Sequence, residues 1–311
     1  MKSTLLTQPL RGIIPPMATP LLDSGELDVA GLERLIERML LGGVHGLFVL
    51  GSTGEGPNLS DRVRRALIQS TCRLVAGRVP ILICITDNCA EESARLGEWA
   101  AECGADVLVS SAPYYFVVSQ DDIFRQIEYV AGRLPLPLYL YNMPKLTKAH
   151  FAPETVARAA ELETVRGIKD SSGDLDYLAA VISALCSRPD FTVLTGPEEL
   201  LRPSMAMGAH GGVNGGANLF PELYVFLYEA LAAGRADEAA HLHRRVIELG
   251  QFLYTVGETE SGYLRGLKLG LELMGVCSSA MTPPFAPASA EDRALLLPRL
   301  ERFAEEWKSD L

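Results

Sequence analysis

Short apolar runs alternate with longer segments of helical periodicity through the first two thirds of the chain. Most of the runs are apolar on both faces, which is typical of parallel strands covered by helices. They predict strands at residues 13–14, 46–50, 81–85, 107–111, 138–142, 165–169, 192–195 and 211–214. The segments between them predict helices at residues 29–41, 61–76, 89–103, 120–131, 152–161, 175–185 and 198–207.

This alternation indicates βα units and an α/β fold with a parallel sheet. Eight strands with seven helices between them are the count of a TIM (β/α)8 barrel. A doubly wound sheet is the alternative, and it would place a G-x-G-x-x-G turn after the first strand. Residues 15–20 read Pro-Pro-Met-Ala-Thr-Pro instead, so we predict the barrel.

The pattern changes after about residue 218. Consecutive helices are expected at residues 221–233, 237–256, 261–274 and 290–308, and no strand signal separates them. We therefore predict a catalytic barrel over residues 1–232 and a C-terminal helical extension over residues 233–311.

Composition narrows the classes of function. The 28 basic and 39 acidic residues give a net charge of −11, and this acidic balance argues against nucleic acid as a partner. No apolar run approaches the roughly 18–20 residues that span a bilayer, so no membrane association is expected. Six scattered cysteines without a C-x-x-C pair predict reduced, mostly buried thiols in a cytoplasmic protein. His241 and His243 would lie on different helix faces, and we predict no metal site.

Lys169 is the most informative single residue. The chain has six lysines, and of these Lys169 alone follows an apolar strand run, which would direct it into the mouth of the barrel. In a pocket of low dielectric constant the pKa of a lysine falls from about 10.4, and the free amine can attack a ketone or aldehyde to give a Schiff base. A structural ion pair with Asp170 or a neighbouring carboxylate is the alternative.

Other polar groups follow the strands that precede Lys169. Residues 51–55, Gly-Ser-Thr-Gly-Glu, offer two hydroxyls and backbone N–H groups that suit a small anion such as a carboxylate. The turn lacks the G-K-[ST] of a P-loop, and it could equally be a plain βα loop, with Glu55 as a helix cap or a structural acceptor. Tyr141 ends the strand before that of Lys169, so the two should be neighbours, although packing alone could explain this tyrosine.

Taken together, the motifs resemble those of the dihydrodipicolinate synthase / N-acetylneuraminate lyase family of class I aldolases. The resemblance covers nearly the whole chain. It rests on Gly-Ser-Thr-Gly-Glu at 51–55, Tyr-Tyr at 114–115, Tyr-Asn-Met-Pro at 141–144 and Gly-Ile-Lys-Asp at 167–170. It implies a Schiff-base lyase that uses pyruvate or another 2-oxo acid and needs no metal or other cofactor, because the lysine itself supplies the electron sink.

The resemblance also implies roles for individual residues. Lys169 would form the imine, and Tyr141 would move protons during imine formation and C–C bond making or breaking. Ser52 and Thr53 would hold the carboxylate of the 2-oxo acid, and one of them would join the proton relay. Tyr115 would reach across a dimer interface into the neighbouring site, within a homotetramer built as a dimer of dimers.

The motifs indicate the second substrate, which reacts with the 2-oxo acid, less clearly than they indicate the imine chemistry. The resemblance implies that Gly196 and Val213 line the pyruvate pocket. True dihydrodipicolinate synthases usually carry an arginine two residues after the proline of Tyr-Asn-x-Pro, where this chain has Leu146. Leu146 followed by Thr147 is closer to the aldolases of sialic acid and of 2-keto-3-deoxy sugar acids. Sugar hydroxyls could bind Thr147 and Glu199, or its neighbour Glu198, although these two glutamates could instead begin a helix.

We therefore predict aldol cleavage or condensation of a 2-keto-3-deoxy sugar acid, or of a related 4-hydroxy-2-oxo acid, with pyruvate as the common substrate. Three alternatives stay open at this point. They are condensation of pyruvate with aspartate semialdehyde, dehydration of a 2-keto-3-deoxy acid, and a catalytically retired barrel that senses a 2-oxo acid.

Overall fold

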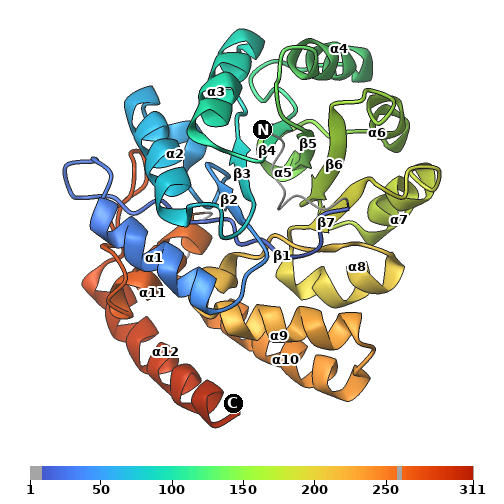
Figure 1. Cartoon of the computed structure of the whole chain (residues 1–311). Coiled ribbons are helices and arrows are strands. Elements are labelled where there is room, and N and C mark those ends of the chain that lie inside the picture. The colour runs from blue at the N-terminus through green and yellow to red at the C-terminus, as the bar shows by residue number, and fades with distance from the viewer. Residues whose placement is uncertain (1–8, 258–260, 311) are drawn as a thin grey trace.

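The fold is a single parallel sheet wrapped by helices (Figure 1). The structure is a computed structural model that describes residues 9–257 and 261–310. Within these residues, eight strands hydrogen-bond in the order β1-β8-β7-β6-β5-β4-β3-β2. They are β1 (Gly12–Ile13), β2 (Leu47–Val49), β3 (Ile81–Cys84), β4 (Val107–Ser111), β5 (Leu138–Asn142), β6 (Val165–Asp170), β7 (Thr192–Thr195) and β8 (Gly211–Gly212).

The sheet closes on itself between β1 and β2. The segment after β1 continues alongside β2, where Pro16 and Phe48 form a parallel bridge. The N–H of Phe48 donates to the carbonyl of Pro15 (2.9 Å), and the N–H of Met17 donates to the carbonyl of Phe48 (2.8 Å). Closure of eight parallel strands makes a TIM barrel, so the predicted fold is confirmed and the doubly wound sheet is excluded.

Glycine is required where β8 meets β1. Gly211 has φ +153°, and a Cβ at this position would lie 1.9 Å from the carbonyl oxygen of Gly12. The two strands can therefore approach closely only because Gly211 carries no side chain.

Helices surround the strands in the βα order predicted from the sequence. They are α1 (Val29–Leu41), α2 (Asp61–Val75), α3 (Ala90–Cys103), α4 (Gln120–Ala131), α5 (Pro144–Thr147), α6 (Pro153–Ala159), α7 (Leu175–Ala184) and α8 (Leu201–Met207), with three 3₁₀ helices, η1 (Gly56–Asn58), η2 (Glu198–Leu200) and η3 (Gly215–Asn218). Several begin at a side-chain cap. Asp28 accepts from the N–H of Gly31, and Ser119 forms a capping box with Asp122.

The remaining helices gather on one side of the barrel (Figure 1). They are α9 (Pro221–Ala232), α10 (Ala236–Leu253), α11 (Gly262–Leu273) and α12 (Ala290–Asp310). The ring of Phe303 on α12 packs edge-on against Phe220 and Phe252, with centroids 5.0 and 5.8 Å away. The domain boundary predicted after residue 232 falls in the turn between α9 and α10 and stays a prediction.

Two details differ from the sequence expectation. The segment after β5 forms a short helix, α5, because Pro144 pre-sets its first turn. The helix predicted over residues 198–207 is divided into η2 and α8.

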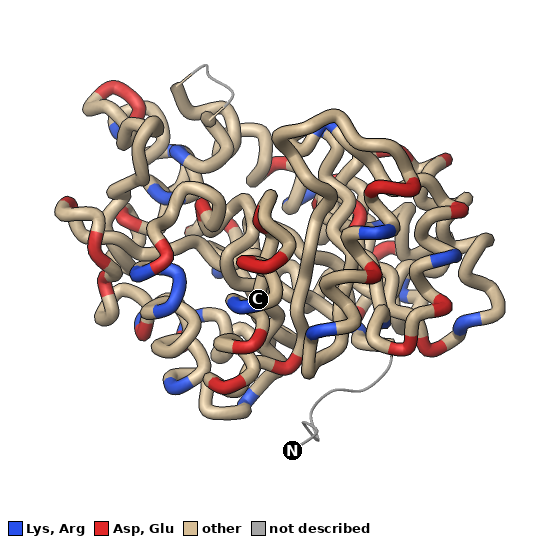
Figure 2. Tube along the Cα trace, turned by 90° about the horizontal axis from the view of Figure 1, so that it is seen from above, with Lys and Arg blue, Asp and Glu red and all other residues tan. Residues whose placement is uncertain are grey.

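The surface properties follow the composition. Acidic and basic positions are interspersed over the molecule (Figure 2). Among the described residues, no helix is long and apolar enough to cross a membrane. The cysteines are all free, and three of them are buried, whereas Cys89 and Cys186 are exposed and Cys103 is partly exposed, so the expectation of mostly buried thiols is half right.

Candidate active site

Lys169 and Tyr141 lie side by side at the carboxyl ends of β6 and β5. The two residues are register partners in the parallel ladder. The Nζ atom of Lys169 lies 4.2 Å from the centroid of the Tyr141 ring and 4.6 Å from that of Phe48 on β2. The side chain of Lys169 therefore crosses the barrel mouth toward β2 between two aromatic faces, and the residue is 6% exposed.

Lys169 has no acidic partner in the part of the chain that the structure describes, where no carboxylate oxygen lies within 4.0 Å of its Nζ. Asp170, the partner that a structural ion pair would use, instead accepts hydrogen bonds from the side-chain amide of Asn142 (2.8 Å) and from the hydroxyl of Ser172 (2.9 Å). Burial without a counter-charge lowers the pKa of Lys169 from 10.5 to about 7. A large fraction of this amine is therefore neutral and nucleophilic near pH 7.

Tyr141 is placed to exchange a proton with a neighbouring hydroxyl. Its Oη atom lies 3.3 Å from the Oγ atom of Ser52, and either oxygen can donate. Burial raises the pKa of Tyr141 to about 12, so the phenol is neutral in the resting site and can act as an acid. An amine, a phenol and a serine hydroxyl thus converge on one region of the mouth.

The turn that carries Ser52 and Thr53 is bounded by two residues in the left-handed backbone conformation. Leu50 and Glu55, at its two ends, have left-handed φ values of 63° and 56°. Such conformations in residues other than glycine cost roughly 1–3 kcal/mol and require support from the surroundings. Within the described residues, the N–H groups of Ser52 and Thr53 donate no hydrogen bond, which leaves two donors for a bound anion.

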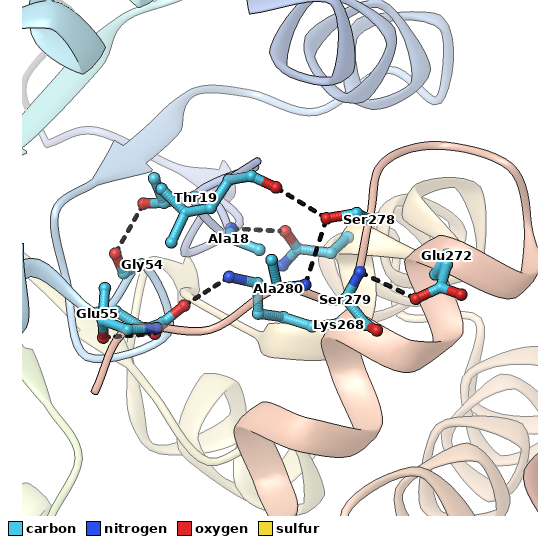
Figure 3. A network of polar contacts seen from close by, with 12 residues as sticks. Ala18, Thr19, Gly54, Glu55, Lys268, Glu272, Ser278, Ser279 and Ala280 are labelled. Atoms are coloured by element: carbon cyan, nitrogen blue, oxygen red, sulfur yellow. Dashed lines mark hydrogen bonds and ion pairs between the residues drawn. The ribbon is translucent and has the colours of Figure 1, made fainter. Parts of the chain in front are cut away.

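A buried ion pair between Glu55 and Lys268 supports this turn (Figure 3). The Nζ atom of Lys268, on α11, donates to the Oε1 atom of Glu55 (2.6 Å), and both side chains are fully buried. The other oxygen of Glu55 accepts from the N–H and the hydroxyl of Thr282, both at 2.7 Å. Thr19 donates to the carbonyl of Gly54 (2.6 Å). Glu55 is therefore a structural acceptor, one of the two roles foreseen. It stands at the N-cap position of η1, but its carboxylate makes no capping hydrogen bond to that helix.

A cleft of about 200 Å³ opens beside Ser52 and Tyr141. Leu146 and Thr147 line it, so both of these residues, which were singled out for the second substrate, border the same cavity as Ser52 and Tyr141. The cleft also contains Arg64, whose guanidinium is shared with Asp87 (3.5 Å) and with the carbonyl of Leu59 (3.0 Å). Its charge is thus partly neutralised by the protein itself.

The other predicted residues lie at the same end of the barrel or at its surface. The N–H of Gly196, after β7, donates to the carbonyl of Asp170 (2.7 Å), and the N–H of Val213, after β8, donates to that of Thr195 (2.8 Å). Glu199 is exposed and pairs with nothing through its carboxylate among the described residues. Tyr115 is 77% exposed, at the tip of the loop between β4 and α4.

Glu198 is committed to the protein interior. Its carboxylate accepts from the N–H of Gly216 (3.0 Å) and from the hydroxyl of Tyr224 (2.8 Å), and the residue is 6% exposed. Burial raises the pKa of this carboxyl from 4.5 to about 7. Both carboxylate oxygens of Glu198 are therefore occupied by these hydrogen bonds, which argues against Glu198 as a ligand for sugar hydroxyls.

Two site residues on α11 were not anticipated from the sequence. Lys268 anchors Glu55, and the hydroxyl of Tyr263 lies 2.5 Å from the Oγ1 atom of Thr53. A signal for Lys268 was present, because it interrupts the otherwise apolar run of residues 267–271. Nothing in the sequence around Tyr263 distinguishes it from a tyrosine that only packs in the core.

Comparison with known proteins agrees with this geometry. A model of the dihydrodipicolinate synthetase family matches residues 9–302. A 4-hydroxy-tetrahydrodipicolinate synthase of Methanopyrus kandleri is 34% identical over 296 residues, which cover 94% of this chain and 96% of the relative. A probable 2-dehydro-3-deoxy-D-pentonate aldolase of Escherichia coli K12, YjhH, is 32% identical over 283 residues, which cover 90% of this chain and 93% of the relative.

Solved structures give the same result. A dihydrodipicolinate synthase from Bacteroides thetaiotaomicron matches with a TM-score of 0.93 and 48% identity, covering 96% of this chain and 100% of that one. YagE of Escherichia coli K12, a prophage protein of the dihydrodipicolinic acid synthase family in complex with pyruvate, matches with a TM-score of 0.90 and 32% identity, covering 95% and 99%. The resemblance seen in the motifs is thus confirmed: the chain belongs to the dihydrodipicolinate synthetase family and is an enzyme of its lyase type.

Proposed function

We propose that the protein cleaves or forms the C3–C4 bond of a 2-keto-3-deoxy sugar acid or a related 4-hydroxy-2-oxo acid, through an imine between Lys169 and the substrate. The observation that carries this proposal is the Lys169 amine. It is buried, has no carboxylate partner in the described part of the chain, and lies 4.2 Å from the Tyr141 ring. A catalytically retired sensor would have no need of this combination.

The reaction begins at the ketone of the 2-oxo acid. The neutral amine of Lys169 attacks C2, and the resulting carbinolamine loses water after its hydroxyl accepts a proton from Tyr141. Tyr141, now a phenolate, removes the proton of the 4-hydroxyl group. The C3–C4 bond then breaks, its electron pair forms an enamine with the imine nitrogen, and the aldehyde leaves. Tyr141, again a phenol, gives its proton to C3 of the enamine, which restores the protonated imine. Water then adds to C2 of this imine; pyruvate is released with a neutral Lys169 amine, and the proton that is set free returns to the Tyr141 phenolate.

The turn at residues 51–55 supports binding of the substrate carboxylate. The N–H groups of Ser52 and Thr53, which donate to none of the described residues, and the two hydroxyls would hold its oxygens. The 3.3 Å contact of Ser52 with Tyr141 links this site to proton transfer. These neutral donors can bind an anion despite the net charge of −11, because the interaction is local.

Reduction with borohydride tests the imine. Incubation with pyruvate and borohydride should add the mass of a reduced pyruvyl group to the peptide that contains Lys169. Lys169→Ala should give no adduct, and Lys308→Ala, which removes an exposed lysine of α12, serves as the matched control. Failure of the wild-type protein to form this adduct would refute the proposed mechanism.

Leu146 supports a sugar acid as the second substrate. It borders the cleft next to Thr147, and the cation among the described lining residues, Arg64, is already paired with Asp87 (3.5 Å), which makes it a weak site for a second carboxylate. The names of several relatives, including that of Methanopyrus kandleri, favour a second candidate, 4-hydroxy-tetrahydrodipicolinate synthase. A panel of 2-keto-3-deoxy acids assayed for pyruvate release, beside condensation of pyruvate with aspartate semialdehyde, separates the two. Faster condensation than cleavage would overturn our choice, and a dehydratase would release no aldehyde.

The exposed loop after β4 supports a homotetramer made of two dimers. Tyr115, Phe116 and Val117 are 77%, 74% and 105% exposed. Contact of apolar side chains with water is unfavourable, and a partner subunit packed on this loop would bury them. In this arrangement Tyr115 enters the cleft of the neighbouring subunit. Sedimentation should find tetramers, and Tyr115→Ala should weaken association; a monomeric wild type would refute this part. A cytoplasmic location is the matching expectation for a chain with free thiols.

A further inference from the structure

Helix α11 contacts the turn of residues 51–55 at two points. Tyr263, in its first turn, brings its Oη atom to 2.5 Å from the Oγ1 atom of Thr53. Five residues later, Lys268 forms the buried ion pair with Glu55 (Figure 3). The same helix thus holds the backbone of the turn through Glu55 and contacts the hydroxyl of Thr53, which the proposed function assigns to the substrate carboxylate.

The hydroxyl of Tyr263 has a fixed position. Its ring packs against that of Tyr254, with centroids 4.8 Å apart. A Cβ at Gly215 would lie 2.6 Å from the Tyr263 hydroxyl, so this glycine allows the phenol to touch the backbone of η3. The phenol is therefore confined between Thr53 on one side and Gly215 on the other.

The direction of the hydrogen bond follows from acidity. A phenol O–H, with a pKa near 10, is a stronger donor than an aliphatic hydroxyl. Burial raises the pKa of Tyr263 further, so the phenol keeps its proton in the site. The geometry allows either oxygen to donate, and the greater acidity of the phenol favours Tyr263 as the donor to Thr53. In that direction the single proton of the Thr53 hydroxyl points elsewhere.

We propose that Tyr263 is a positioning residue for substrate binding: it orients the Thr53 hydroxyl so that its proton is directed at the carboxylate of the 2-oxo acid. This inference rests on the proposed function, in which Thr53 is a carboxylate ligand. Tyr263 contributes no proton to the reaction and should affect affinity much more than turnover.

Tyr263→Phe tests the proposal, because it removes the hydroxyl and keeps the ring on Tyr254. The KM for the 2-oxo acid, and the pyruvate concentration that half-saturates borohydride trapping, should each rise roughly three- to tenfold, while kcat changes by less than about twofold. Thr53→Val should give a similar loss, and adding Tyr263→Phe to Thr53→Val should change the KM no further. Tyr224→Phe, which removes a buried hydroxyl bonded to Glu198 and not to Thr53, is the matched control.

Different outcomes refute different claims. An unchanged KM in Tyr263→Phe, additive losses in the double variant, or an equal loss in Tyr224→Phe would each refute positioning by Tyr263. A fall in kcat at constant KM would instead assign Tyr263 to the chemistry and would also refute it. Calorimetric titration of Lys169→Ala with pyruvate, with and without Tyr263→Phe, measures carboxylate binding without an imine. It therefore tests Tyr263 even if the wild-type protein forms no adduct and the proposed function fails.

Discussion

Lowering the pH below about 7 should slow the reaction of Lys169 with a 2-oxo acid about tenfold for each pH unit, because only the neutral amine attacks the ketone. Burial between the rings of Tyr141 and Phe48, without a counter-charge, lowers the pKa of Lys169 from 10.5 to about 7. This difference corresponds to roughly 5 kcal/mol against the ammonium form. At pH 7 about half of the molecules carry the neutral amine, compared with about one in three thousand for a lysine of pKa 10.5.

The assay mixes the protein with saturating pyruvate at pH values from 5 to 9 and quenches timed samples into alkaline borohydride. The rate at which the Lys169 peptide gains the adduct should rise up to about pH 7 and stay level above it. Lys268 is an internal control, because it is equally buried but paired with Glu55, and it should acquire no adduct. A rate that still rises between pH 8 and 9 would show an ordinary lysine and refute the reasoning. A rate independent of pH would do the same.

Three substitutions extend these expectations. Tyr141→Phe removes the phenol that faces Ser52 and should lower kcat roughly 10²–10⁴-fold in a pyruvate-release assay; near-normal turnover would exclude Tyr141 from proton transfer. Glu55→Gln leaves the Lys268 ammonium buried without a carboxylate, so it should lower the free energy of unfolding by about 3–5 kcal/mol. Denaturant unfolding measures this change, and an unchanged midpoint would contradict the expectation. Gly216→Ala places a Cβ 2.0 Å from the Tyr224 hydroxyl and should destabilise by about 1–3 kcal/mol in the same assay; wild-type stability would count against it.

The barrel could be predicted because its strands are buried on both faces and its helices on one. Hydrophobic periodicity reports this burial directly, and βα alternation then leaves few topologies. Strand order alone predicted that Tyr141 and Lys169 are neighbours, because they stand at the ends of consecutive parallel strands. In the structure the two residues are register partners of β5 and β6. The short helix α5 could have been expected too, since Pro144 favours the first turn of a helix.

The contribution of α11 could not be predicted in the same way. The contact of Tyr263 with Thr53 spans 210 positions of the sequence, and that of Lys268 with Glu55 spans 213. Periodicity describes neighbours three or four residues apart and carries no information on such pairs. Strand order also gives no guidance, because α11 follows the last strand and its place depends on packing between helices.

The distance along the chain between Glu55 and Lys268 has a consequence for synthesis. A growing chain can form β1 to β8 before α11 exists, since every strand among the described residues precedes residue 213. Until Lys268 emerges, the left-handed conformation of Glu55 has no cation to hold it. At roughly 5–20 residues per second, the ribosome needs several seconds to pass from β8 to the end of α11. During this interval a nascent barrel would hold its reactive lysine but lack the support of its anion-binding turn, so competence for substrate should arise late, as one of the last events of folding.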